Sequence, residues 1–541
     1  MRPKACVKCR QWKTKCSLSE GSTDGCSRCQ SLKIPCVFDA SYKRNSKRIS
    51  VPTTPSEPQE LRQGYTDIRA STTRNNATAQ EIVLPTDWST LVPTSLPSDT
   101  PQPISKPPES RENGIQIGNV SISPAQATEY FRIYFLRCHQ YLPFKMATTS
   151  PKEVRARSPL LFWVICAVAS TWKIHPELQS MIKMMVQGTL YSTMHTVDAV
   201  QALLILCLWP SPISSLNEDP SYYLSGLATQ ISLQLGLHRP SLLHSHQYLQ
   251  EMLSRNDDTE VKLTTCLACF VVHQLQSAAR GLPPLSQVDF HLLKSLDNPV
   301  VHPNLSQLCR ICYVMSQTTE AICAKSSTPS GMLEPDARLN MVGLCDQQFA
   351  TLQQQHLQYM SEVVEIVFLN ARLQLWSFAL LPDISSLQGA QGYVSKAQRD
   401  AVNLIDLCCD RNLAVAPFHI RHAMSYSGFV LVSALQSRQL EDCDVARHNL
   451  ERVCQALEAI NCGPNDISHK ASQILRELPN LEYSTDRQPI QSRMGATLLY
   501  DSLRRYYEHK HLSDSLSQQN GDQMRAFDLD GIDWCSLSLL L

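Results

Sequence analysis

The sequence predicts an all-α protein in three parts: a small cysteine-rich module, a disordered linker, and a large multi-helix body. Three observations predict this arrangement. Six cysteines fall within the first 36 of the 541 residues. Residues 51–110 contain ten prolines and many serines and threonines. From about residue 120, apolar residues recur at spacings of three and four, which is the period of an amphipathic helix.

The charge of the chain is unevenly distributed. Its formal net charge is zero, but residues 1–50 hold twelve lysines and arginines against three acidic residues. The first 50 residues therefore carry +9 and the remainder carries −9. A basic head on an acidic body predicts that the head alone has a polyanionic partner.

We expect the chain to be soluble and intracellular, with no membrane partner. Its start, MRPKACVKC, lacks the apolar segment of a secretory signal. The longest apolar runs, PLLFWVICAVA and AVQALLILCLW, are well short of the roughly 20 residues that span a bilayer. In a reducing compartment, the 21 cysteines are expected to be thiols or metal ligands rather than disulfides.

The cysteines near the start form a duplicated pattern, C-x2-C-x6-C-x9-C-x2-C-x6-C. Structural zinc takes four ligands in a tetrahedron, so three cysteines in each half leave each metal one ligand short. Two zinc ions that share two thiolates satisfy both sites with six sulfurs. The sequence therefore predicts a binuclear zinc cluster with six ligands, namely Cys6, Cys9, Cys16, Cys26, Cys29 and Cys36.

Three alternative structures fit these cysteines less well. A disulfide knot is disfavoured because the secretory signal is missing. Two unrelated redox CxxC pairs would give no role to Cys16 and Cys36. A protein-binding RING or LIM relative usually needs eight ligands, often including histidine, and the first 50 residues contain no histidine.

The stretches CVKCRQWKTKC and CSRCQSLKIPC resemble the fungal binuclear zinc cluster (six-cysteine) transcription factors. The resemblance implies that Cys6 and Cys26 bridge both metals. It also implies that Cys9 and Cys16 complete one site and that Cys29 and Cys36 complete the other. The sequence departs from the family pattern in lacking the usual loop proline, so Gly21 or Gly25 is expected to supply that turn.

The basic side chains around the cluster are expected to bind DNA. Six thiolates and two zinc ions carry a net charge of about −2, so phosphate binding needs surrounding cations. RQWKTK after Cys9 is expected to form a short helix that metal binding must stabilise. The resemblance implies that Lys13 contacts base edges in a CGG-like triplet, although Trp12 replaces a basic residue common in the family. The other candidate DNA-binding residues are Arg10 and Lys15, expected on phosphates, and Lys4, Lys8 and Lys33.

The segment that follows the cluster is expected to be disordered. SYKRNSKR, residues 41–48, is basic and suits phosphate contact, nuclear import or a plain solvated linker. Many family members carry a coiled coil here, but ELRQGYTDIRASTTRNNATAQEIV lacks sustained apolar heptads. Dimerisation through this segment is not predicted, and both a monomer and a homodimer formed through the body stay open.

The large body also resembles the family, in its "middle homology" regulatory domain, over roughly residues 125–300. The matching features are Gly226 in YYLSGLA, then LGLHRPS from Leu235 to Ser241, and GLPP from Gly281 to Pro284. The helical periodicity predicts about ten or more helices in the body, and the resemblance implies a ligand- or partner-responsive domain. We expect no enzyme, because the sequence contains no G-x-S-x-G, P-loop or HExxH motif.

The end of the chain, MRAFDLDGIDWCSLSLLL, alternates acidic and apolar residues. Such alternation is typical of activation segments that dock into coactivator grooves. The apolar candidates are Phe527, Leu529, Ile532 and Trp534. A final helix that packs on the body is the alternative.

Together these features predict a nuclear transcription regulator of RNA polymerase II genes, with DNA and coactivators as partners. The expected divisions are 1–48 for the zinc module and its basic tail, 49–120 for the linker, 121–480 for the helical body and 481–541 for the carboxy-terminal segment. A secondary-metabolite gene cluster is one expected target, and genes of secreted proteases or amino-acid metabolism are another. A zinc-stabilised adaptor that never meets DNA remains the alternative function.

Overall fold

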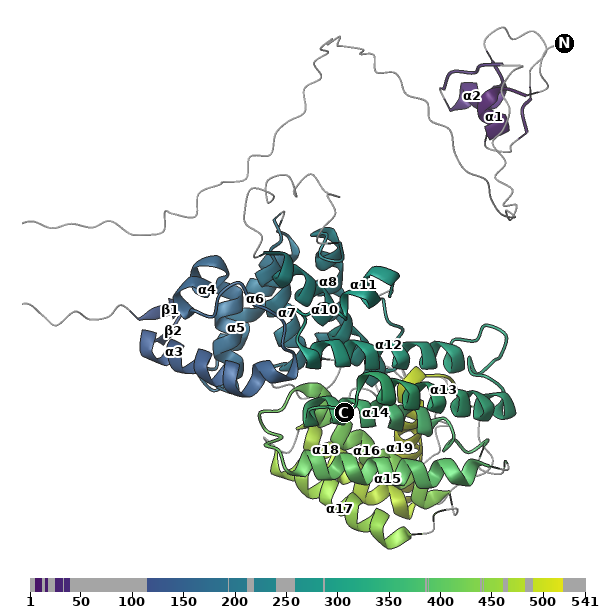
Figure 1. Cartoon of the computed structure of the whole chain (residues 1–541). Helices are drawn as coiled ribbons and strands as arrows, with labels where there is room; N and C mark the ends of the chain where they lie inside the picture. Colours follow the sequence, from purple (N-terminus) through teal and green to yellow (C-terminus); the bar gives the residue numbers. More distant parts are fainter. Residues whose placement is uncertain are drawn as a thin grey trace, which may run out of the picture. The chain divides into compact units, whose positions relative to one another are not determined.

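The computed structural model contains two units that are described separately, residues 1–104 and residues 105–541 (Figure 1). In the first unit the structure describes residues 5–11, 15–17, 25–32 and 34–38. In the second it describes 114–192, 194–211, 218–239, 258–285, 288–384, 387, 389–437, 440, 442–460, 466–481 and 490–518. Residues 49–113 of the linker expected over 49–120, the basic segment at 41–48 and the apolar residues of the tail lie outside these ranges.

The first unit contains two helices of five residues, α1 (Val7–Gln11) and α2 (Ser27–Ser31). Both are far too short to be stable without tertiary support. The Sγ atom of Cys26 caps α2 by accepting a hydrogen bond from the backbone N–H of Cys29. Helix α1 begins three residues earlier than the helix expected for RQWKTK, and residues 12–14 of that stretch lie outside the described part.

The second unit is a helical body, which confirms the predicted all-α class. A short antiparallel hairpin precedes it, in which Ile115 of β1 (Ile115–Ile117) pairs with Ile122 of β2 (Val120–Ile122). Helix α3 (Pro124–Ile133) then begins at a capping box formed by Ser123 and Gln126, followed by the π-helical turn η1 (Tyr134–Cys138). The hairpin shows that ordered structure begins before residue 120, the expected end of the linker.

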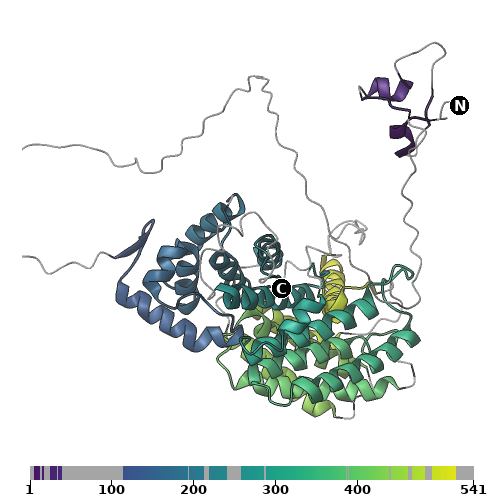
Figure 2. The ribbon, with the colours of Figure 1, turned by 45° about the horizontal axis from the view of Figure 1, so that its top comes forward.

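The helices of the body fall into two groups, which Figures 1 and 2 show from two directions. One end holds α3 to α8, and the other holds α13 to α19, with α10 and α12 between them. The first group continues with α4 (Pro151–Arg157), α5 (Pro159–Ala169), α6 (Leu178–Leu190), α7 (Val197–Leu208) and α8 (Ser221–Gln234). The remaining bounds are α10 (Asp258–Arg280), α11 (Phe290–Ser295), α12 (Pro303–Cys323), α13 (Pro335–His356), α14 (Glu362–Ser377), α15 (Ala390–Cys409), α16 (Phe418–Gln436), α17 (Cys443–Ala459), α18 (Ile467–Glu477), η5 (Met494–Ala496) and α19 (Thr497–Gln518).

One continuous hydrophobic core extends through the body, and α10 lies near its middle. Every residue of α10 from Leu267 to Ala279 is buried, including four polar residues. Two of these are paired inside the protein: the Gln276 side-chain amide donates to the Cys207 carbonyl, and the Ser277 hydroxyl donates to the His273 carbonyl. Pairing of this kind offsets the cost of burying a polar group.

The end of α10 connects the two groups of helices. Arg280 forms an ion pair with the buried Asp219, and its guanidinium lies 5.0 Å from the ring centre of Phe418 in α16. The hydroxyl of Tyr500 in α19 donates to the Arg280 backbone carbonyl at 3.1 Å. Helix α19 therefore belongs to the helical body. The body extends beyond residue 480, where we expected it to end.

No helix within the described residues is both long and apolar enough to cross a membrane. The cysteines in the apolar stretches CLAC and CRIC lie in α10 and α12. Cys269, Cys309 and Cys312 are buried, and burial raises the pKa of each thiol. They are core side chains.

The turn after α10 requires a glycine. Gly281 has φ +63°, and a Cβ atom there would overlap the carbonyl oxygen of Arg493. We predict that Gly281→Ala lowers the free energy of unfolding by about 1–3 kcal/mol, through left-handed strain and the clash. Chemical denaturation followed by circular dichroism measures this loss.

Gly392 provides the matched control. It lies in α15, and a Cβ atom there would meet no heavy atom within 4 Å. Gly392→Ala should change stability by no more than about 1 kcal/mol, in the stabilising direction. Equal effects of the two substitutions would contradict the proposed role of the Gly281 turn.

Candidate metal centre

Six cysteine sulfurs come together in the first unit. Two groups of four each place their Sγ atoms within 4.8 Å of one another. One group is Cys6, Cys9, Cys16 and Cys26, and the other is Cys6, Cys26, Cys29 and Cys36. The groups share Cys6 and Cys26, so six sulfurs provide eight coordination places. The rest of the described chain contains no further group of this kind.

The distances between the sulfurs fit tetrahedral zinc. Sγ of Cys6 lies 3.9 Å from that of Cys26 and 3.7 Å from that of Cys29, and Sγ of Cys9 lies 3.8 Å from that of Cys26. A tetrahedron with Zn–S bonds of about 2.3 Å has sulfur–sulfur edges of about 3.8 Å. A disulfide would bring two sulfurs to about 2.05 Å, and all six cysteines are free thiols.

The two halves of the module have the same backbone contacts. The N–H groups of Cys9 and Cys29 each donate at 3.4 Å to the sulfur three residues earlier, on Cys6 and Cys26. The N–H of Cys6 donates to Sγ of Cys16, and the N–H of Cys26 donates to Sγ of Cys36. The duplication in the sequence is therefore a duplication of structure, with four donors directed at four sulfurs.

Two backbone hydrogen bonds cross between the halves. The N–H of Val7 donates to the carbonyl of Val37 at 2.8 Å, and the N–H of Ser27 donates to the carbonyl of Ser17 at 3.1 Å. Each half therefore anchors the first residue of the other half's helix. These crossed bonds were not predicted, because cysteine spacing carries no information about which backbone groups meet.

The hydrogen bonds bias the shared sulfurs towards the thiolate form. The N–H of Cys29 is the main cause of a pKa of about 6 for Cys26. Burial opposes ionisation of Cys6, but the N–H of Cys9 and neighbouring thiols outweigh it and lower the pKa. Burial raises the pKa of Cys16 to about 12. Thiolate is the form that binds a metal, so the shared pair is prepared for ligation.

Few of the predicted DNA-binding residues can be placed. Lys8, on α1, and Lys15 are exposed, as is Arg28 on α2. Arg10 lies in α1, although its side chain lies outside the described part. Lys4, Lys13 and Lys33 also lie outside it, as do Phe527, Leu529, Ile532 and Trp534. Two of the described basic side chains, Lys8 and Arg28, lie on the two short helices that carry Cys9 and Cys29.

Two of the three motifs of the body, the Gly226 segment and GLPP, meet beside α10. The hydroxyl of Tyr222, in the Gly226 segment of α8, donates to the carbonyl of Pro283 at 2.9 Å. Burial lowers the pKa of His273 to about 4, so its ring is neutral. Its Nε2 accepts from the backbone N–H of Leu285 at 3.0 Å, and its Nδ1 lies 2.9 Å from the Ser225 hydroxyl. His273 joins the Gly226 segment to the residue that follows GLPP, and the sequence did not single it out.

These observations define a binuclear cysteine–metal module attached to an all-helical body. Residues 4–45 match the fungal Zn(2)-Cys(6) binuclear cluster domain, and residues 129–377 match the fungal specific transcription factor domain. The two matches together cover more than half of the chain. The chain belongs to the fungal Zn(2)-Cys(6) transcription factors, and its module binds two zinc ions.

The curated relatives of this chain are named as transcription factors or transcriptional regulators. The chain is 28% identical over 497 residues to the putative transcription factor SEF1 of Kluyveromyces lactis. The aligned region covers 87% of this chain and 42% of that protein. It is 27% identical to the SEF1 protein of Eremothecium gossypii, over 88% of this chain and 47% of the relative. It is 25% identical to the transcriptional regulatory protein SEF1 of Candida albicans, over 88% and 59%. The chain thus spans about half the length of these relatives. No solved structure matches it significantly.

The turn before the second half of the module gives a test of its packing. Gly25 has φ +118°, and a Cβ atom there would lie 2.6 Å from Cβ of Cys36. We predict that Gly25→Ala weakens zinc binding roughly tenfold or more, because Cys36 must move away from its group. Competition with a chromophoric chelator, together with native mass spectrometry of the zinc content, measures the change.

The duplicated half supplies the control. Ala5 occupies the position before Cys6 that Gly25 occupies before Cys26. Ala5→Gly introduces no Cβ clash and should leave the zinc affinity within about threefold of the original. A Gly25→Ala variant that binds two zinc ions as tightly as the unchanged chain would contradict the packing argument.

Proposed function

We propose that the chain is a nuclear, sequence-specific DNA-binding regulator of RNA polymerase II transcription that binds CGG-like triplets. The single observation that supports this most is the sharing of Cys6 and Cys26 between two four-sulfur groups, with exposed lysines beside them. Such sharing is expected of a two-zinc cluster. The names of the relatives and the domain matches support the same function.

The proposed ligand roles follow from the two groups. Cys6 and Cys26 bridge both zinc ions, since each belongs to both groups. Cys9 and Cys16 complete one tetrahedron, and Cys29 and Cys36 complete the other. When bound, the zinc ions supply no reaction; they hold α1 and α2 in place, which helices of five residues cannot do alone.

The basic residues are proposed to divide between bases and phosphates. Lys13 stands two residues beyond the end of α1 in the sequence, and it is proposed to contact the major-groove edge of guanine, where N7 and O6 accept hydrogen bonds. Lys8 and Lys15, which are exposed, neutralise phosphates and fix the position of the module on the duplex. Arg10, Lys4 and Lys33 are proposed to add to this phosphate contact.

Loss of the base contact should reduce specific binding. We predict that Lys13→Ala in the zinc-loaded chain weakens binding to a CGG-containing duplex by about 1–3 kcal/mol, with little change for a scrambled duplex. Lys8→Ala should weaken binding to both duplexes and reduce the slope of log K against log salt by about 1. Fluorescence anisotropy over a salt series measures both effects.

Lys183→Ala is the control for these titrations, since Lys183 is exposed on α6 of the body. Identical binding by the unchanged chain and the Lys13→Ala variant would overturn the assignment of the base contact. A zinc-loaded chain that binds neither duplex would favour the alternative function, a zinc-stabilised protein adaptor.

The carboxy-terminal segment is proposed to recruit coactivators through Phe527, Leu529, Ile532 and Trp534. Deletion of residues 525–541 should reduce reporter activation several-fold while leaving DNA affinity unchanged, because the zinc module is intact. A matched variant replaces the four apolar residues with serine and keeps the acidic ones. Unchanged reporter activation in both variants would remove the activation role from this segment.

The target genes are proposed to lie in a secondary-metabolite gene cluster, with genes of secreted proteases or amino-acid metabolism as the second candidate. Chromatin immunoprecipitation with sequencing of the full chain identifies them. The same experiment separates one triplet from two spaced triplets, and hence a monomer from a dimer.

A further inference from the structure

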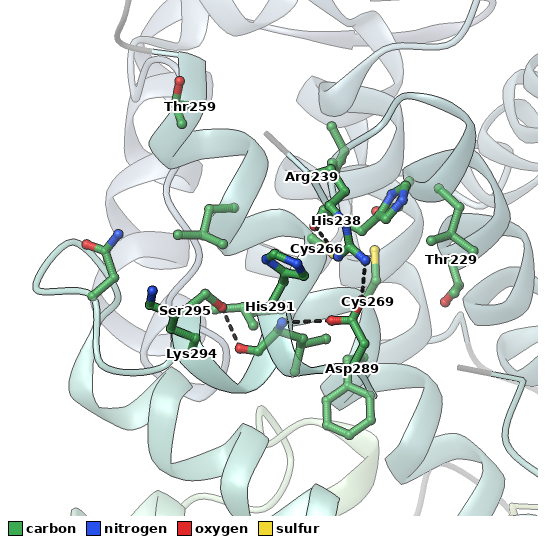
Figure 3. Close-up of a pocket in the computed structure, with 18 of the residues that line it drawn as sticks. Thr229, His238, Arg239, Thr259, Cys266, Cys269, Asp289, His291, Lys294 and Ser295 are labelled. Carbon is green, nitrogen blue, oxygen red and sulfur yellow. Dashed lines mark hydrogen bonds and ion pairs between the residues drawn. The ribbon is translucent and has the colours of Figure 1, made fainter. Parts of the chain in front are cut away.

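A large cavity lies in the helical body between α8, α10 and α11 (Figure 3). Its volume is about 1120 Å³, which slightly exceeds the roughly 300–1,000 Å³ typical of small-molecule sites. Side chains from three helices line it, together with the turn after α8 that carries Leu237 and Arg239. The cavity is therefore built by the fold and is not a gap beside a single element.

The floor of the cavity is mainly apolar, with Thr229 and Ser232 of α8 as polar exceptions. Leu237, Leu267 and Phe270 are buried side chains of the core, and Leu263 and Leu292 are partly buried beside them. No charged side chain of α10 reaches the cavity among the described lining residues. A ligand that lies on this floor removes its own apolar surface from water. This burial contributes about 25 cal/mol for each Å² of that surface.

The charged groups gather at the rim, and most are already paired. Arg239 forms an ion pair with Asp289 at 2.5 Å, and Asp289 also accepts a hydrogen bond from the Leu292 N–H at 2.9 Å (Figure 3). Asp297 forms an ion pair with Arg310 at 2.5 Å. Both acidic groups of the described lining are thus neutralised by arginines.

Lys294 is different from these residues. It is exposed on α11 at the rim, and no carboxylate in the described part of the body lies within 4 Å of its ammonium group. His291, one turn earlier on the same helix, is also exposed at the rim. Among the described residues, the rim therefore offers a positive charge without a carboxylate partner above an apolar floor.

We propose that this cavity binds a small amphipathic acid, with its apolar body on the leucine and phenylalanine floor and its anionic group beside Lys294. The head group stays at the exposed rim, so it keeps part of its hydration and avoids the cost of burying a charge. A neutral molecule of the same shape would gain only the apolar contacts, and a cation would be repelled. This inference does not depend on DNA binding by the zinc module.

The test uses the full zinc-loaded chain and three probes that share one apolar chain. Octanoate, 1-octanol and octylammonium carry charges of −1, 0 and +1 at about pH 7.5. Isothermal titration should show saturable one-to-one binding of octanoate, weaker binding of octanol, and the weakest binding of octylammonium. Higher ionic strength should weaken the binding of octanoate and leave that of octanol unchanged, because screening acts on the charge alone.

Lys294→Gln should weaken octanoate binding roughly threefold to tenfold, since an exposed ion pair contributes modestly. It should leave octanol binding unchanged, and Lys183→Gln on α6 is the charge-matched control. Lys294 is exposed, so its substitution should not disturb the fold. Absence of saturable octanoate binding, or equal affinities in the Lys294→Gln and Lys183→Gln variants, would overturn the proposal.

A second measurement locates the ligand without any substitution. Cys266 lines the cavity and is partly exposed, whereas Cys409 is exposed at the end of α15 and lies outside the cavity lining. Octanoate should slow labelling of Cys266 by N-ethylmaleimide and leave that of Cys409 unchanged, as read by peptide mass spectrometry. Protection of neither residue, or of both equally, would place the octanoate elsewhere and overturn the site.

Discussion

Helix α10 is the constraint on which the helical body depends. Thirteen consecutive residues, 267–279, are buried, so this part of the helix has no face exposed to solvent. It must be surrounded, and α7, α8, α12, α16 and η5 all pack on it. The polar residues among the thirteen fix the arrangement further, because each unpaired buried group would cost about 1–3 kcal/mol. Gln276 can meet the Cys207 carbonyl only if α7 stays in register with α10.

The same helix connects the cavity to the carboxy-terminal half. Its first half supplies Leu263, Leu267 and Phe270 to the cavity floor. Its last residue, Arg280, contacts α16 and α19. Between them, His273 holds the GLPP turn through the Leu285 N–H. A molecule in the cavity would therefore touch a rigid element whose other end is packed against the half of the body that follows the family match.

Cysteine spacing made the metal centre predictable, while the body was predictable only as a class. Six ligands at duplicated spacings leave few ways to complete two tetrahedra, so the sequence pointed to the sulfurs that the structure gathers. The crossed bonds from Val7 to Val37 and from Ser27 to Ser17 could not be predicted, because they join backbone groups far apart in sequence. Helical periodicity predicted the class of the body, but an apolar residue that lines a cavity, such as Leu263, has the same pattern as one in the core. The charged and aromatic sequence of α19 concealed that it packs on α16.

The crossed backbone bonds have a consequence for metal loading. Each half of the module anchors the helix of the other, and each four-sulfur group borrows a sulfur from the opposite half. In a molecule with a single metal ion, the half without metal would not hold in place the sulfur that it shares with the other half. The ligands of its second site would then be incompletely positioned. We therefore expect loading to be cooperative, so that scarce metal would give a mixture of empty and full molecules. As the zinc supply falls, the number of fully loaded molecules would fall while partly loaded molecules stay rare. The fraction of molecules able to bind DNA would then depend on the zinc supply more steeply than it would with two independent sites.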